Sequence, residues 1–163
     1  MSLSRYKIYT DGSCIINPGA GGYAAILVDE TGARVEITGS EALTTNNRME
    51  LTAAIVALKK IAAGDTAEIF TDSQYLKNAF VQGWLEKWKR NGWKNSAKKP
   101  VLNQDLWLEL DALISSRAVR FHWVKGHAGN IFNERCDKLA RTEAEVQKIR
   151  AVAERLPVQL ELF

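Results

Sequence analysis

The chain has 163 residues, 46% of them hydrophobic, which is enough for one domain with a sizeable core. Its formal net charge is only +3, and it contains no run of about 18 apolar residues, so the sequence predicts no membrane span. The first residues lack the apolar segment of a signal peptide, and the two cysteines, Cys14 and Cys136, make no disulfide framework, so we expect a cytoplasmic protein with two reduced thiols. We also expect a monomer that does not bind membranes.

The first part of the chain predicts three strands and then a helix. The strands are expected over residues 5–13, 23–29 and 34–42. The first strand ends near Asp11 and is followed by a loop over 14–22 that is rich in turn residues. A helix of about four turns is predicted over 44–65, with Thr and Asn residues at its start and Gly64 at its end.

The remainder of the chain alternates strands and helices. Two further strands are expected over 67–73 and 118–126, and three helical segments over 74–93, 103–116 and 133–156. The first of these helical segments should be interrupted near Gly83 and closed near Gly92. This order predicts an α/β fold with a five-stranded mixed sheet, in which three antiparallel strands are followed by parallel strands, and with helices on both faces.

The basic residues are concentrated in one short segment. Residues 84–100 hold six of the 22 Lys and Arg residues, only one acidic residue, and three of the five tryptophans. Acidic residues slightly outnumber basic residues in the rest of the chain. The basic surplus therefore belongs to one region and not to the whole surface.

Two of the predicted strands end in the same way, in the segments "KIYTDGS" and "EIFTDSQ". Ligands of α/β sheets gather beyond the carboxyl ends of parallel strands, where Asp11 and Asp72 would both lie if their strands are adjacent and parallel. Each residue also has a local explanation. Asp11 could be a turn residue, and Asp72 could be a helix N-cap that Ser73 supports.

Two further acids belong to predicted helices. Glu50 follows Asn47 at the spacing of a capping box, but it also lies in the first turn of a helix that must pack on the sheet. Asp137 could simply pair with Arg141 one turn later, which is worth a few tenths of a kcal/mol. Each local explanation is acceptable alone, but together they require four acids to reach element ends or packed helix edges by coincidence.

Four carboxylates at one point would repel one another and raise one another's pKa values. Such a cluster is tolerated chiefly when divalent cations neutralise it, and ligands that are all oxygen favour Mg²⁺ or Mn²⁺ over zinc. Two such ions roughly 4 Å apart clamp the attacking water and the leaving oxygen of a phosphodiester. The hypothesis is that each Thr-Asp strand end supplies one metal ligand.

The motifs "YTDGSC", "TTNNRMEL", "IFTDSQY" and "WVKGHAG" with "NERCD" closely resemble type 1 ribonuclease H of the bacterial kind, from about Tyr6 to Arg141. The resemblance implies a ribonuclease H-like fold and endonucleolytic cleavage of the RNA strand of RNA–DNA hybrids, which leaves 3′-hydroxyl and 5′-phosphate ends. It implies two Mg²⁺ ions, with Mn²⁺ as an alternative. Their ligands would be Asp11, Glu50, Asp72 and Asp137, and Asp11 would touch both ions.

The resemblance also implies residues that help catalysis and bind the substrate. His127 matches a loop histidine that assists proton transfer or product release, whereas His122 is expected to be structural. The positions that meet the RNA minor groove, where the 2′-hydroxyl distinguishes RNA from DNA, are Cys14, Asn17, Asn46 and Gln74. Thr45 and Asn47 match positions on the DNA strand, with Thr45 in a phosphate pocket.

Residues 84–100 match the basic handle of the family. The handle residues expected to bind the hybrid are Trp84, Lys87, Trp88, Lys89 and Arg90. Their cations would neutralise DNA phosphates, which makes binding dependent on salt. The two tryptophans share a helix face and could either rest on a deoxyribose or pack inward, and the sequence leaves both possibilities open.

The chain is expected to divide into a catalytic domain over 1–142 and an extension over 143–163. The last five residues, Gln159-Leu160-Glu161-Leu162-Phe163, resemble the peptide by which bacterial replication and repair proteins dock on the DNA sliding clamp. Pro157 would end the preceding helix, Gln159 offers an amide, and Leu160, Leu162 and Phe163 offer apolar anchors for a groove. The alternative is a tail that folds back over its own domain.

Two other functions compete with the ribonuclease H interpretation. Proofreading exonucleases share a similar sheet, but their first strand carries Asp-x-Glu, whereas Gly12 and Ser13 follow Asp11 here. A non-catalytic module that binds hybrids is not excluded by the fold alone. The presence of all four acids argues against that module, because binding by itself gives no reason to accept their repulsion.

Overall fold

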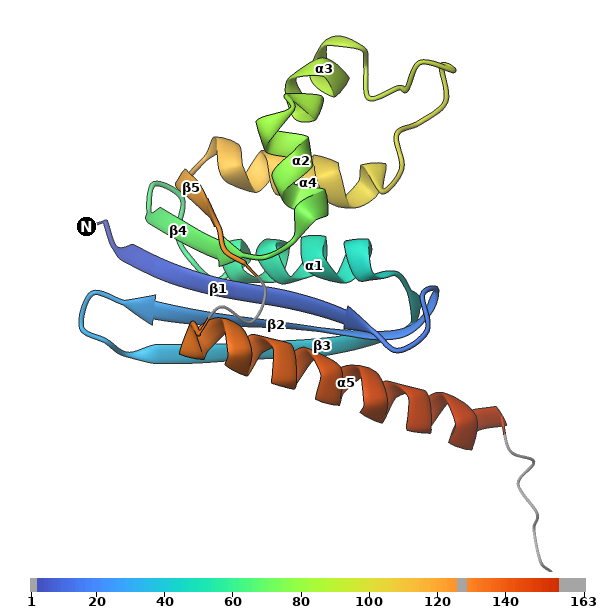
Figure 1. Cartoon of the computed structure of the whole chain (residues 1–163). Coiled ribbons are helices and arrows are strands. Elements are labelled where there is room, and N and C mark those ends of the chain that lie inside the picture. Colours follow the sequence, from blue (N-terminus) through green and yellow to red (C-terminus); the bar gives the residue numbers. More distant parts are fainter. Residues whose placement is uncertain (1–2, 126–128, 156–163) are drawn as a thin grey trace, which may run out of the picture.

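The computed structural model describes residues 3–125 and 129–155, in which helices cover both faces of a five-stranded sheet (Figure 1). The strands are β1 (Arg5–Cys14), β2 (Gly19–Asp29), β3 (Arg34–Thr44), β4 (Thr66–Thr71) and β5 (Ala118–Trp123). Their order across the sheet is β3-β2-β1-β4-β5. The pairs β3–β2 and β2–β1 are antiparallel, whereas β1–β4 and β4–β5 are parallel, which confirms the predicted fold class.

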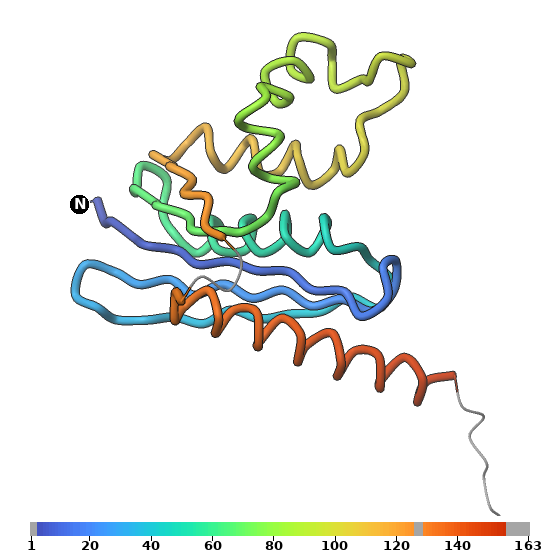
Figure 2. Tube along the Cα trace, viewed as in Figure 1, coloured from blue at the N-terminus to red at the C-terminus, as the bar shows by residue number. Residues whose placement is uncertain are grey.

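The helices in the described part of the chain are α1 (Asn46–Lys59), α2 (Gln74–Val81), α3 (Trp84–Arg90), α4 (Gln104–Ser115) and α5 (Ile131–Arg155). Helix α1 crosses one face of the sheet beside α4, while α5 runs alone along the other face (Figures 1 and 2). The predicted interruption near Gly83 is confirmed, because this residue adopts a φ of 70° between α2 and α3. None of the described helices combines the length and the apolar character that crossing a bilayer requires.

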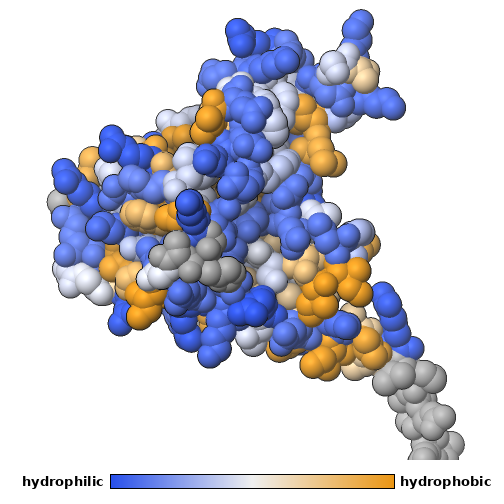
Figure 3. Space-filling view, viewed as in Figure 1, coloured by the Kyte–Doolittle hydropathy of each residue, from blue (hydrophilic) through white to orange (hydrophobic). Residues whose placement is uncertain are grey.

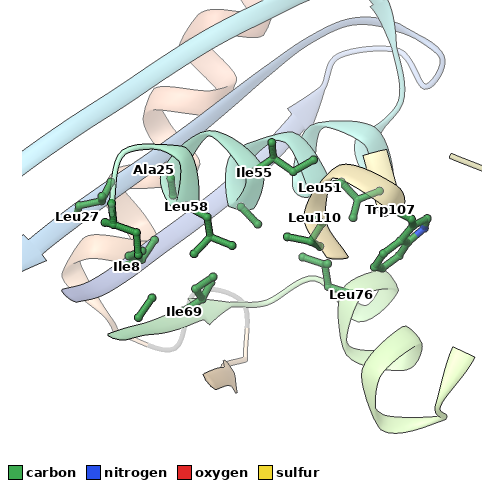
Figure 4. Packing of buried hydrophobic residues seen from close by; sticks show 14 of the residues in the cluster. Ile8, Ala25, Leu27, Leu51, Ile55, Leu58, Ile69, Leu76, Trp107 and Leu110 are labelled. Atoms are coloured by element: carbon green, nitrogen blue, oxygen red, sulfur yellow. The ribbon is translucent and has the colours of Figure 1, made fainter. Parts of the chain in front are cut away.

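Two hydrophobic clusters hold the helices to the sheet. Successive residues of a strand point to opposite faces, so Ile8 of β1 packs beneath α1 while Tyr9 packs beneath α5. The larger cluster includes Leu51 and Leu58 of α1 and the fully buried Trp107 of α4 (Figure 4). Because both faces are covered, the sheet is a rigid platform whose strand ends can hold a site.

Several predicted element boundaries are wrong by a few residues. The loop expected over 14–22 is shorter, because β1 continues to Cys14 and β2 begins at Gly19. Helix α1 ends at Lys59, well before Gly64, and the chain then turns tightly while the Asp65 carboxylate accepts hydrogen bonds from two backbone amides. Helix α5 begins two residues earlier than predicted, because the Asn130 side chain caps it.

Helix α5 approaches β2 closely at Gly22. A Cβ atom on this glycine would lie 2.3 Å from the Ala140 carbonyl oxygen and 2.7 Å from the Ala144 backbone nitrogen. Both alanines are fully buried, so no flexible side chain could move aside. This contact fixes the distance between α5 and the sheet. Helix α5 also continues without a break across residue 142, where the domain boundary was expected.

Gly22→Ala should therefore lower the free energy of unfolding by roughly 1–3 kcal/mol, because the added methyl group must push the α5 backbone away from the sheet. Urea unfolding followed by circular dichroism measures this loss. The matched control is Gly32→Asn, at a φ of 86° with open space around it, which asparagine tolerates. Equal stability losses in the two variants would contradict the close contact.

Candidate active site

The parallel pairing of β1 and β4 brings two acids to the same edge of the sheet. Their last paired residues are Tyr9 and Phe70, and Asp11 and Asp72 follow two residues further along each chain. The carboxylates of Asp11, Glu50 and Asp72 each offer one oxygen, and these three oxygens all lie within 4.8 Å of one another. The fold therefore gathers three of the four predicted metal ligands at one point.

A glycine in β1 allows Glu50 to reach this point. A Cβ atom on Gly12 would lie 2.5 Å from the Glu50 backbone nitrogen and 2.6 Å from the Met49 carbonyl carbon. Only a residue without a side chain lets the first turn of α1 come this close to β1. The Gly12 backbone N–H also donates to the Asp11 carboxylate at 2.9 Å, which fixes the orientation of that carboxylate.

Asp137 lies on α5 at the rim of the same site. It lines, with the three clustered acids, an open depression of about 480 Å³. Its carboxylate is not part of the 4.8 Å cluster and instead pairs with the Arg141 guanidinium at 2.9 Å, as the spacing of the two residues predicts. Its negative charge nevertheless contributes to raising the pKa of Asp11.

The capping explanations for Glu50 and Asp72 are wrong. Thr45, and not Asn47, is the N-cap of α1, and its hydroxyl accepts from the Arg48 backbone N–H at 3.2 Å. Ser73, and not Asp72, is the N-cap of α2, because its hydroxyl accepts from the Leu76 N–H. Since neighbouring hydroxyls satisfy these helix ends, neither carboxylate is needed as a cap.

The clustered carboxylates are costly in their ionised form. Burial and the nearby charge of Asp72 raise the pKa of Asp11 to about 7. Burial, followed by the charge of Asp11, raises the pKa of Glu50 well above its usual range. The buried Oε2 atom of Glu50 has no hydrogen-bond partner among the described residues.

This donor set fits a hard divalent cation. All three clustered groups offer carboxylate oxygens, which Mg²⁺ and Mn²⁺ prefer as ligands. A cation beside Glu50 Oε2 would supply the interaction that this buried oxygen lacks, and it would offset the repulsion between the ionised acids.

Most of the predicted RNA-facing residues surround the acids. Cys14, Asn46 and Gln74 line the same depression, and so does Asn47, which was predicted to meet the DNA strand. Asn17, on the β1–β2 loop, is tied to it because its side-chain oxygen accepts from the Asn46 backbone N–H at 3.3 Å. The groups expected to bind RNA therefore form a rim around the carboxylates.

The tryptophans of the handle pack inward. Trp88 has its ring centroid 5.4 Å from Trp107 and 6.0 Å from Trp84, and both Trp84 and Trp88 pack against the main core while staying partly exposed. This packing fixes α3 on the rest of the domain. Contact of these rings with a deoxyribose stays a prediction.

The basic side chains of the handle differ in whether they already form an ion pair. The Lys89 ammonium lies 2.7 Å from the Asp111 carboxylate of α4 and is already paired. Lys87, Arg90 and Lys94 are exposed and form no ion pair within the described part of the chain. The exposed cations are therefore the stronger candidates for phosphate contacts.

Sequence reasoning missed a polar network that joins three helix ends around the site. The Arg48 guanidinium makes two hydrogen bonds, of 3.0 and 2.8 Å, to the Asp105 carboxylate and a third to the Asn103 side-chain oxygen. The Tyr75 hydroxyl accepts from the Asn103 amide and the Trp107 indole. No local pattern could reveal it, since 57 residues separate Arg48 from Asp105.

The structure describes His122 but not His127. His122 pairs with Glu68 at 3.1 Å and stacks on Phe70, away from the carboxylate cluster, which agrees with the structural role expected for it. His127 lies outside the described residues, as does the C-terminal segment with Gln159, Leu160, Leu162 and Phe163.

Asp11→Asn should stabilise the metal-free protein at neutral pH. Because the pKa of Asp11 is higher in the folded state than its usual value of 3.8, this group favours folding below about pH 4 and loses that contribution as the pH rises through about 7. In EDTA, the variant should exceed the parent by about 1–3 kcal/mol above pH 7 and match it near pH 4. Urea unfolding at a series of pH values measures the difference.

The matched control for this prediction is Glu36→Gln. Arg135 lowers the pKa of Glu36, so removing this charge should leave stability unchanged or reduce it at neutral pH. An Asp11→Asn variant that is no more stable than the parent above pH 7 would contradict the raised pKa.

Comparisons with known proteins agree with this geometry. A family model described as RNase H matches residues 4–145. Ribonuclease H of Nitratidesulfovibrio vulgaris (strain DSM 19637 / Miyazaki F) is 52% identical over 144 residues, which cover 88% of this chain and 92% of that protein. Ribonuclease H of Rhodopseudomonas palustris (strain BisB5) is 56% identical over 134 residues, which cover 82% of this chain and 88% of that protein.

Solved structures show the same architecture. The crystal structure of LC9-RNase H1, a type 1 RNase H with the type 2 active-site motif, gives a TM-score of 0.79 at 31% identity, covering 90% of this chain and 75% of that chain. LC11-RNase H1, solved in complex with an RNA/DNA hybrid, gives a TM-score of 0.66 at 23% identity, covering 86% of this chain and 97% of that chain. This likeness supports the fold alone. The chain therefore belongs to the RNase H family of enzymes.

Proposed function

We propose that this enzyme hydrolyses the RNA strand of RNA–DNA hybrids with two Mg²⁺ ions, and that it leaves 3′-hydroxyl and 5′-phosphate ends. The observation that carries the proposal is the cluster of Asp11, Glu50 and Asp72, in which one buried carboxylate oxygen of Glu50 has no hydrogen-bond partner within residues 3–125 and 129–155. The family relationship supports the reaction, and the motifs that resemble type 1 ribonuclease H support the hybrid as its substrate. We propose that the enzyme acts as a monomer in the cytoplasm.

In this proposal, Asp11, Glu50, Asp72 and Asp137 hold the ions. The bound ions would activate a water molecule for attack on phosphorus and stabilise the 3′-oxygen as it leaves. Asp11 is central because it comes from the middle of the sheet and is oriented by the Gly12 N–H. Asp137, which stands at the rim and pairs with Arg141, can approach the cluster by a change of side-chain rotamer.

The selectivity for RNA rests on the rim of the site. Amide side chains both donate and accept hydrogen bonds, so Asn17, Asn46 and Gln74 can read a 2′-hydroxyl group that DNA lacks. Cys14 lies beside them and lines the same depression. The RNA strand would be cut because only that strand satisfies these groups next to the carboxylates. His127 would assist proton transfer or product release.

The DNA strand would lie against α1 and the handle. Thr45 and Asn47 at the start of α1 would contact this strand, and Thr45 would help to hold a phosphate. Further along the strand, the handle would supply Lys87, Lys89 and Arg90, with Trp84 and Trp88 beside them. The exposed Lys87 and Arg90 are the cations best placed to attract phosphates, because Lys89 is already paired with Asp111.

Asp11→Asn should reduce hybrid cleavage in Mg²⁺ by a factor of roughly 10³ or more, because the central ligand loses its charge. The assay uses a hybrid with labelled RNA, beside duplex DNA, duplex RNA and single strands. Circular dichroism checks that the variant is folded, and Glu36→Gln, which removes a surface acid of β3 that is not part of the cluster, should keep full activity.

Three results of this assay would contradict the proposal. Preferred cleavage of duplex DNA would favour a different nuclease, and turnover by Asp11→Asn would place the metal centre elsewhere. Hybrid binding by the parent without cleavage in Mg²⁺ or Mn²⁺ would favour the non-catalytic binding module.

Lys87→Ala should weaken hybrid binding and reduce the slope of log K against log salt by about 1, because one phosphate contact is lost. Lys60→Ala, an exposed lysine that follows the far end of α1, is the control and should leave the slope unchanged. Fluorescence anisotropy at 50–300 mM salt, in Ca²⁺ to prevent cleavage, measures both. Equal slopes for all three proteins would remove Lys87 from the binding surface.

We further propose that the C-terminal segment docks on the DNA sliding clamp through Gln159, Leu160, Leu162 and Phe163. A chain truncated before Val158 should lose binding to the clamp by at least about tenfold in surface plasmon resonance, since it lacks every anchor of the motif. Equal affinity of the full and truncated chains would eliminate the docking.

A further inference from the structure

An uncovered apolar groove lies along the last turns of α5. A hollow of about 680 Å³ is lined by Ile15 of the β1–β2 loop together with Glu145, Lys148, Ile149, Val152 and Ala153 of α5. Ile149 is 68% exposed and Val152 is 52% exposed, so no described residue covers them. Figure 3 shows hydrophobic residues gathered on this part of the surface, next to the end of α5.

The segment after α5 starts where this groove ends. The groove covers the ten residues before Arg155, a distance of about 15 Å along a helix. If residues 156–158 reverse the chain at Pro157, the five residues 159–163 span about 17 Å when extended. The segment is therefore long enough to cover the groove, and it begins at the correct end of it.

The sequence of this segment matches the lining of the groove. In an extended chain, alternate side chains share a face, so Leu160 and Leu162 form an apolar stripe. Their partners would be the exposed Ile149, Val152 and Ile15. Gln159 and Glu161 belong to the other face of the extended segment, which would point away from the groove.

We propose that residues 156–163 fold back and dock into the groove between α5 and Ile15. The tether holds the segment near the groove at an effective concentration on the order of millimolar, so a contact with an intrinsic Kd well below about 1 mM is occupied most of the time. In the absence of a partner, the segment would occupy this groove.

This docking has two consequences. Leu160 and Leu162 cannot contact the groove and a sliding clamp at once. A clamp must therefore displace the segment from the groove before the clamp can bind the segment. The docked segment also contacts Ile15, which follows Cys14 at the rim of the catalytic depression. Both consequences rest on the proposed function, whereas the docking itself does not.

Methyl NMR of the full chain tests the docking without any partner. The signals of Ile15, Ile149 and Val152 are compared among the full chain, a chain ending at Arg155, a Leu160→Ser/Leu162→Ser variant and a Gln159→Ser/Glu161→Ser control. We expect the truncation and the leucine variant to shift these signals in the same direction, while the control retains the positions of the full chain. Amide exchange over 145–153 should become about threefold faster or more in the first two proteins.

Three results would overturn the proposal. Signals unchanged by the truncation would show that the segment lies elsewhere. Differences that vanish when the full chain is diluted from 500 to 10 µM would assign the groove to a second copy of the chain. A control variant as disruptive as the leucine variant would exclude the apolar stripe. Because no clamp or hybrid is present, failure here leaves clamp docking and catalysis to their own tests.

Discussion

The repulsion among the carboxylates at the ends of β1 and β4 is the constraint around which the structure is organised. Asp11, Glu50 and Asp72 come from three elements and offer oxygens within 4.8 Å of one another in a partly dry site. Such an arrangement costs free energy in the absence of a cation, and packing elsewhere in the domain must offset that cost. The two hydrophobic clusters on either side of the sheet supply this packing and hold in place the elements that carry the carboxylates.

Much of the fold followed from local patterns. Strand alternation and helix periodicity were enough to predict the order of the elements, and Gly83 correctly predicted the break between α2 and α3. The meeting of Asp11 and Asp72 was also predictable, because parallel neighbours end at the same edge. Boundaries were less accurate where a side chain decides them, as Asn130 does at the start of α5.

The parts that could not be predicted depend on contacts between distant residues. Capping statistics suggested Asn47 and Asp72 as caps, yet hydroxyls one or two residues away cap both helices. The need for glycine at position 12 arises from the backbone of α1, which is 37 residues further along the chain and gives no local signal. The pairing of Lys89 with Asp111 likewise became visible only when α3 was placed beside α4.

The unbroken course of α5 has a mechanical consequence. Asp137 lies near the start of α5 and Arg155 at its end, so the two residues are about 27 Å apart along one continuous helix. Near the middle of α5, Gly22 lies in close contact with Ala140 and Ala144, so a tilt of the helix relative to the sheet would pivot about this contact. A force applied at the far end of α5 would then change the orientation of Asp137, because no break in the helix lies between the two positions.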